Sequence, residues 1–158
     1  MMLNTLKQRE FSKAQYINNK CVSLQHEDNF YLLQLLIPHQ LEKNQTLICE
    51  LKNKPKLILL VKDCFKYTVE FELKYQFKNS VSESVVIRNY LDAKVAELMY
   101  CTDFQRFIRL MGPKISPHVH FKTRMSLNRF LDKWLNYLLQ NGYNASAWKS
   151  LDNPNDSI

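Results

Sequence analysis

Apolar and polar side chains alternate without a break from Tyr67 to Phe77. The odd positions are apolar or aromatic and the even ones are polar: Tyr67, Val69, Phe71, Leu73, Tyr75 and Phe77 against Thr68, Glu70, Glu72, Lys74 and Gln76. This period of two is typical of a β-strand with one solvated face. A shift of one residue would move every large side chain into water, so the register is strongly specified. The pattern predicts an antiparallel sheet that is exposed on one side.

Further strand patterns lie on both sides of this segment. Thr46–Lys52 and Lys56–Lys62 precede it, and the short loops between them predict neighbours in a meander. Val85–Tyr90 is a fourth predicted strand. Ala93–Tyr100 fits a fifth strand after a turn or bulge at Asp92, although its apolar positions also fit a helix. We favour the strand.

Two helical patterns complete the predicted domain. Asp28 is a good N-cap, and the apolar stripe that follows it predicts a short helix from Asp28 to Ile37. The second helix is predicted from Ser126, as its cap, to Asn141, with Gly142 as a left-handed stop. Its apolar positions are Leu127, Phe130, Leu131, Trp134, Leu135 and Leu138, and its polar side carries Asn128, Arg129, Asp132, Lys133 and Asn136.

The predicted fold class is therefore α+β. An antiparallel sheet of four to five strands has an N-terminal and a long C-terminal helix packed on one face. We expect residues 1–22 to form a weakly ordered arm or helix, residues 23–143 to form one domain, and residues 144–158 to be a polar, disordered tail. A chain of 158 residues is long enough for one core without disulfides.

The chain carries no apolar run long enough for a signal peptide or a membrane span, so we expect a cytoplasmic protein without membrane contact. The cysteines are Cys21, Cys49, Cys64 and Cys101, and no two of them have metal-binding spacing. We expect reduced thiols, of which Cys49, Cys64 and Cys101 lie in or beside strands as small buried groups.

Several segments resemble a known family. The stretches NFYLLQLLIP, VVIRNYLDAKVAEL, FQRF and NRFLDKWLNYLLQNG are similar to the YqiB-like family of small cytoplasmic gammaproteobacterial proteins. The resemblance covers about Leu24 to Tyr143 and implies no biochemical activity. The matching residues are Asn29, Phe30, Arg88, Tyr90, Asp92, Ala93, Val95, Ala96, Glu97, Phe107, Asn128, Phe130, Leu131, Trp134 and Gly142.

Arg88, Tyr90, Asp92 and Glu97 form a first candidate site for a ligand or partner. On a strand, Arg88, Tyr90 and Asp92 share a face and could bind a small anionic or hydroxylated ligand. The alternative is an ion pair that braces a turn. Glu97 is an odd number of residues from Asp92, so a two-carboxylate catalytic pair is not favoured without a bulge.

His118 and His120 would point the same way on an extended segment, as a metal site or proton shuttle requires. No third ligand is close in sequence, so we favour exposed loop histidines and expect no metal. The chain has only two glycines, Gly112 and Gly142, and no GxSxG motif. Phosphate-cradling loops are thereby excluded, and we expect no cofactor.

The net charge of +7 is concentrated between Phe104 and Arg129, where there are six basic residues and only one type of charge. The basic residues of this segment could contact nucleic acid or an acidic partner. They are Arg106, Arg109, Lys114, Lys122, Arg124 and Arg129. The interleaved Phe104, Phe107 and Phe121 could stack on single-stranded nucleic acid, or could belong to the core.

The sequence thus favours a non-enzymatic adaptor or regulator that contacts an unidentified protein partner through a basic surface. RNA or single-stranded DNA binding by the basic segment is one alternative. A small ligand-binding or hydrolase domain that uses Arg88, Tyr90 and Asp92 is another. We expect a monomer or a homodimer.

Overall fold

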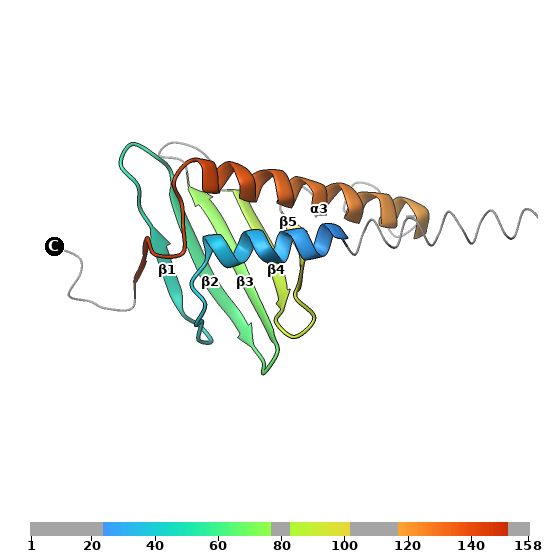
Figure 1. The fold of residues 1–158 in the computed structure, drawn as a ribbon, viewed down its shortest axis with the longest axis horizontal. Coiled ribbons are helices and arrows are strands. Elements are labelled where there is room, and N and C mark those ends of the chain that lie inside the picture. The colour runs from blue at the N-terminus through green and yellow to red at the C-terminus, as the bar shows by residue number, and fades with distance from the viewer. Residues whose placement is uncertain (1–23, 77–82, 102–116, 152–158) are drawn as a thin grey trace, which may run out of the picture.

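The computed structural model describes residues 24–76, 83–101 and 117–151, and it has an α+β fold (Figure 1). A helix over residues 24–36 comes first. The remaining elements are β1 (Thr46–Cys49), β2 (Lys56–Cys64), β3 (Thr68–Gln76), β4 (Glu83–Tyr90), β5 (Val95–Cys101), α3 (Pro117–Gln140) and β6 (Trp148–Ser150). The predicted class and the two helices on an antiparallel sheet are confirmed.

The six strands form one antiparallel sheet in the order β5-β4-β3-β2-β1-β6. Its centre is β3, where Val69, Phe71, Leu73 and Tyr75 are buried, as the alternation predicts. Tyr67 departs from the prediction: it lies in the β2–β3 turn and is exposed. Phe77 lies outside the described residues.

Both helices cover the same face of the sheet and run side by side in the same direction (Figure 1). The core between helices and sheet includes Leu33 of the 24–36 helix, Phe71 of β3 and Leu135 of α3, all fully buried. Trp134 is partly buried and makes an edge-to-face contact with Tyr75. The burial of these large side chains, at about 1.5–3 kcal/mol each, stabilises the two-layer arrangement.

The fifth strand is confirmed as β5, and it follows a turn over residues 91–94. A sixth strand, β6, stands where the sequence analysis expects a disordered tail, and Trp148 pairs with Cys49 of β1. The Trp148 indole N–H also donates to the Leu36 carbonyl oxygen at 2.8 Å. That expectation is therefore wrong for β6, because the indole fixes the segment onto the sheet edge. Residues 1–22 and 152–158 lie outside the described residues.

The C-terminal helix is longer than predicted. It begins at Pro117 and not at Ser126, because proline is well tolerated in the first turn of a helix. Its end is as predicted: Gly142 has φ of 96°, and the Tyr143 amide donates to the Leu138 carbonyl at 3.2 Å. Among the helices of the described residues, none is both long and apolar enough to cross a bilayer.

Candidate functional site

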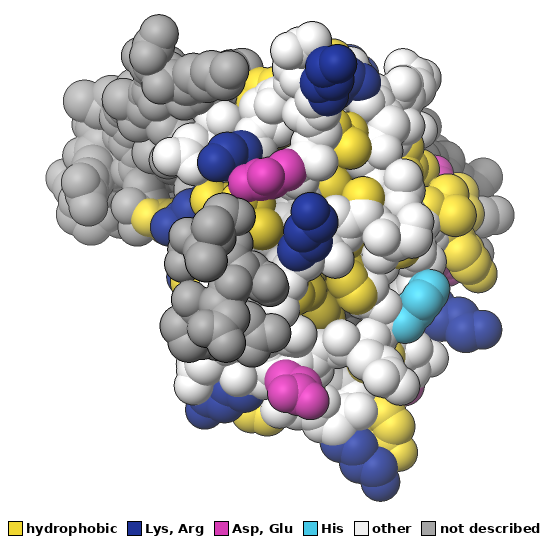
Figure 2. Space-filling view, turned by 90° about the vertical axis from the view of Figure 1, so that its left-hand side faces the viewer, with side chains coloured by type: hydrophobic (Ala, Val, Ile, Leu, Met, Phe, Trp, Pro, Cys, Tyr) yellow, Lys and Arg dark blue, Asp and Glu magenta, His cyan; other side chains and the backbone are white. Residues whose placement is uncertain are grey.

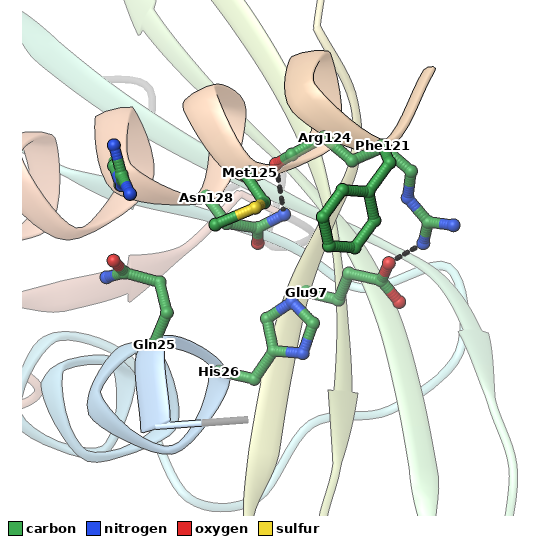
Figure 3. Close-up of a pocket in the computed structure, with 8 residues that line it drawn as sticks. Gln25, His26, Glu97, Phe121, Arg124, Met125 and Asn128 are labelled. Carbon is green, nitrogen blue, oxygen red and sulfur yellow. Dashed lines mark hydrogen bonds and ion pairs between the residues drawn. The ribbon is translucent and has the colours of Figure 1, made fainter. Parts of the chain in front are cut away.

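A cavity of about 220 Å³ lies where three elements meet: the start of the 24–36 helix, the edge strand β5 and the first half of α3. Figure 3 shows side chains from all three elements converging on it. They are Gln25, His26, Glu97, Phe121, Arg124, Met125, Asn128 and Arg129. Because the side chains of Arg124 and Arg129 are exposed, the cavity opens to solvent on their side.

An ion pair between Arg124 and Glu97 joins α3 to β5 at this cavity (Figure 3). Glu97 faces away from the core, and its neighbour across the strand pair is Arg88. Since β5 is the edge strand, the Glu97 carboxylate can reach past the edge to α3. The side chain of Glu97 is only 14% exposed, so its pairing with Arg124 compensates part of the cost of its burial.

Asn128 is buried and holds α3 against the same strand. Its side-chain oxygen accepts the Leu98 backbone N–H at 2.9 Å, and its Nδ2 donates to the Arg124 carbonyl at 2.9 Å. Asn29 of the 24–36 helix donates through Nδ2 to the Asn128 carbonyl at 3.2 Å. The sequence analysis placed Asn128 on the solvated side of its helix, which is wrong. Its amide is buried because it satisfies an unpaired donor of the edge strand.

His26 is half-buried in the wall of the cavity. Burial lowers the pKa of its imidazole from the usual 6.5, and the positive charge of Arg124 lowers it further. His26 is therefore neutral near pH 7. A neutral imidazole offers one hydrogen-bond donor and one acceptor to anything held in the cavity.

The chemistry of the lining is mixed. Phe121 and Met125 supply an apolar, polarisable wall from α3. Arg124 and Arg129 are cationic and Glu97 is anionic, so the lining carries about one net positive charge with His26 neutral. Apolar walls with a few placed polar groups are typical of small-molecule sites. The cavity is smaller than the pockets of roughly 300–1,000 Å³ that hold drug-sized ligands.

Three of the four residues of the first predicted site lie together: Arg88 faces Glu97 across the β4–β5 pair and is hydrogen-bonded to Tyr90. Arg88 donates from Nε and Nη2 to Glu70 Oε2, at 3.1 and 2.8 Å, across the β3–β4 pair. The hydrogen bond to Glu70 raises the pKa of Arg88 most, and a hydrogen bond to Tyr90 raises it further. Asp92 lies in the exposed turn after β4, so it does not share a strand face with Arg88 as assumed. Of the four, Glu97 lines the cavity.

The histidine pair lies in helical backbone and not in an extended segment. His118 and His120 belong to the first turn of α3, so the period of two that gave them a shared direction does not apply. In the described part of the chain, no group of three His, Cys, Asp or Glu side chains could hold a metal ion.

Two of the three described cysteines are buried as expected. Cys49 and Cys101 are buried and form no disulfide, and burial raises the pKa of Cys49. Cys64 is exposed, contrary to the expectation, because it is the last residue of β2. It contacts the Leu41 carbonyl at 3.3 Å. Cys21 lies outside the described residues.

Three of the six basic residues of the basic segment belong to the described part of the chain. Lys122, Arg124 and Arg129 lie on the exposed side of α3, and two of them line the cavity. Arg106, Arg109 and Lys114 lie outside the described residues, as do Phe104 and Phe107. On the side of the molecule where β1 lies, Lys and Arg side chains stand apart, with apolar and acidic side chains between them (Figure 2).

Sequence reasoning missed Gln25, His26, Phe121 and Met125 as members of one site. They come from two helices far apart in the chain, so no local spacing links them to Glu97. One signal was present: Phe121 and Met125, upstream of Ser126, lie at three- and four-residue helical steps from Asn128 and Arg129. Because the helix was predicted to begin at Ser126, Phe121 and Met125 were not assigned to it.

Residues 32–144 match the family described as protein of unknown function DUF1249. The match spans most of the chain. The protein belongs to this family. No curated protein and no solved structure matches the chain. The match covers β5, α3 and only residues 32–36 of the 24–36 helix, so Gln25 and His26 of the cavity lie outside it.

Proposed function

We propose that this DUF1249 protein is a non-enzymatic binding module that holds a small organic ligand in the cavity between the 24–36 helix, β5 and α3. The supporting observation is the lining itself. An apolar wall from Phe121 and Met125 faces polar groups from two other elements, His26 and Glu97. Such a combination both buries a ligand's apolar surface and orients its polar groups.

The geometry around the cavity favours regulation over catalysis. Asn128 uses its side chain to bind Leu98 and Arg124, and Glu97 is paired with Arg124. A ligand held beside this ion pair would change the charge around it and so the strength of the contact between α3 and β5. Ligand occupancy would then be transmitted to the helix surface, which is what a regulator requires.

The test is a ligand-observed NMR screen of neutral and charged fragments against the full chain. The variant Met125→Trp fills the cavity, and Phe65→Trp adds the same indole in the exposed β2–β3 turn as a control. We expect fragments that bind the wild type and Phe65→Trp but not Met125→Trp. Fragments that bind all three proteins equally, or none at all, would contradict the proposal.

A second candidate is an adaptor role through α3, favoured by its solvent-facing side. Phe130 and Tyr137 are 48% and 50% exposed, and Lys122 and Lys133 are exposed on the same helix. Exposed aromatic side chains beside cations fit a partner with an acidic surface. We place this role in the cytoplasm, and we also propose that the chain is a YqiB-like member of its family.

Affinity capture from crosslinked cells tests the adaptor role with Lys122→Glu/Lys133→Glu. The matched control, Lys52→Glu/Lys149→Glu, reverses two exposed lysines away from α3. A partner lost only with the first pair supports the adaptor role. A partner kept by both variants contradicts it. If ribonuclease releases the captured material from the protein, and if its binding to the protein weakens steeply with salt, the RNA alternative is supported instead.

A further inference from the structure

We infer that the ligand of this cavity is a small organic monoanion, a carboxylate whose apolar body lies against Phe121 and Met125 and whose charged group is received by Arg129. This inference rests on the proposed function and names the class of ligand. Three features carry it: an arginine that has no acidic partner among the described residues, a surplus of one positive charge in the described lining, and the position of the apolar wall.

Of the two arginines in the described lining, Arg129 is the one that is not paired with Glu97. Arg124 is held by Glu97, whereas in the described part of the chain no acidic side chain forms an ion pair with Arg129. The nearest acid along α3 is Asp132. Its two carboxylate oxygens accept hydrogen bonds from Gln25 at 2.8 Å and from Asn136 at 2.7 Å. Both oxygens of Asp132 are therefore directed to neutral amide donors, and among the described residues Arg129 has no ion-pair partner for its guanidinium at the cavity.

The charge balance selects an anion with a single charge. With Glu97 cancelling Arg124, the lining has one surplus positive charge, on Arg129. A carboxylate neutralises that charge and can accept two parallel N–H donors from a guanidinium. A phosphate monoester carries roughly −1.5 to −2 near pH 7, so it would leave excess negative charge beside Glu97. A cationic ligand would be repelled by Arg129.

The apolar wall determines where the rest of the ligand lies. Figure 3 shows the Phe121 ring and the Met125 side chain extending from α3 into the space above His26. A flat or aliphatic body there buries its surface against the ring and the thioether sulfur. His26, neutral near pH 7, can bind a hydroxyl or carbonyl group of the ligand without adding charge.

The experiment uses four probes of nearly one shape and different charge: benzoate, benzamide, phenyl phosphate and benzylamine. Affinities are measured by NMR titration with the wild type, Met125→Trp, Arg129→Gln and the control Lys133→Gln, whose exposed cation is outside the cavity lining. Benzoate should bind about tenfold more tightly than benzamide, since a hydrogen bond between charged groups is stronger than one to a neutral amide. Arg129→Gln should remove about that factor for benzoate alone, and Lys133→Gln should not.

Equal binding of benzoate and benzamide to the wild type, lost in Met125→Trp, would overturn the monoanion inference and leave the proposed function standing. Tighter binding of phenyl phosphate or benzylamine would overturn it in the same way. Benzoate binding that survives Met125→Trp would place the anion elsewhere and also overturn it. If no probe and no screened fragment binds, the inference and the proposed function both fail.

Discussion

The side-chain oxygen of Asn128 accepts the backbone N–H of Leu98 at 2.9 Å, across a gap of 30 residues in sequence. Leu98 lies on β5, the edge strand of the described sheet, so none of the described strands pairs with its outward N–H. Asn128 therefore closes the sheet edge with a side chain of α3. Asn128 also lines the candidate cavity.

Replacing Asn128 by alanine should destabilise the protein by about 1–3 kcal/mol, because a buried N–H loses its acceptor. Urea denaturation measures this. The control is Asn136→Ala, an exposed amide of the same helix, for which we expect a change within about 0.5 kcal/mol. The Leu98 amide should also exchange faster with solvent in Asn128→Ala. Equal stability of the two variants would contradict the assigned role of Asn128.

His26 should make folding stability depend on pH. Burial and Arg124 lower its pKa from 6.5 in the folded protein, so the unfolded chain binds a proton more readily. The contribution of His26 to the free energy of unfolding should therefore be constant above pH 6.5. It should fall as the pH drops through 6.5 towards the lowered pKa of the folded protein. Other groups also titrate, so the comparison is with His26→Gln.

Urea denaturation of both proteins at about pH 7.5 and about pH 5.5 isolates the histidine. Wild type should lose more stability than His26→Gln over this interval. A larger loss in the variant would mean that the folded state favours protonated His26, contrary to its burial beside Arg124.

The indole of Trp148 should be a stabilising contact of β6. Trp148→Phe keeps a ring but removes the donor to the Leu36 carbonyl, and about 1 kcal/mol of stability should be lost. Thermal unfolding at one scan rate measures this. The control, Lys149→Ala, changes the exposed middle residue of the same strand and should have little effect. A wild-type melting temperature in Trp148→Phe would show that β6 is not fixed by this bond.

Substitution of Gly142 should lower the stability of the protein because of its left-handed backbone conformation and not because of a steric clash. Its φ is 96°, and the nearest atom to an added Cβ is Leu51 Cδ1 at 3.7 Å, an ordinary contact. Gly142→Ala should therefore cost about 1 kcal/mol, and Gly142→Asn should cost less, since asparagine tolerates this conformation better. Chemical denaturation of both variants decides this. The reverse order would indicate a steric cause.

Local patterns predicted the elements whose burial repeats regularly. Val69 to Tyr75 alternate because β3 is central and covered on one face, and Leu131, Leu135 and Leu138 repeat because α3 packs on that face. Hydropathy alone could not place Asn128, since an amide is counted as polar whether it meets water or a sheet edge. Nor could it find β6, whose three residues gain their order from β1, far away in sequence.

The candidate site was harder to predict than the fold. Glu97 was selected from its neighbours on β4 and β5, but its carboxylate pairs with Arg124 of α3. Arg88 finds its partner in Glu70, directly opposite on β3, and not in Asp92. These pairings depend on strand register and on how the helix sits at the edge, which local spacing does not encode.

The most direct test of the central claim, that the cavity binds a small carboxylate, is a benzoate titration followed by backbone amide chemical shifts. The claim predicts saturable changes confined to residues 24–26, 97–98 and 121–129, and their loss in Met125→Trp. Saturable changes centred on β1 and β2, or no change at any benzoate concentration that leaves the protein folded, would contradict it.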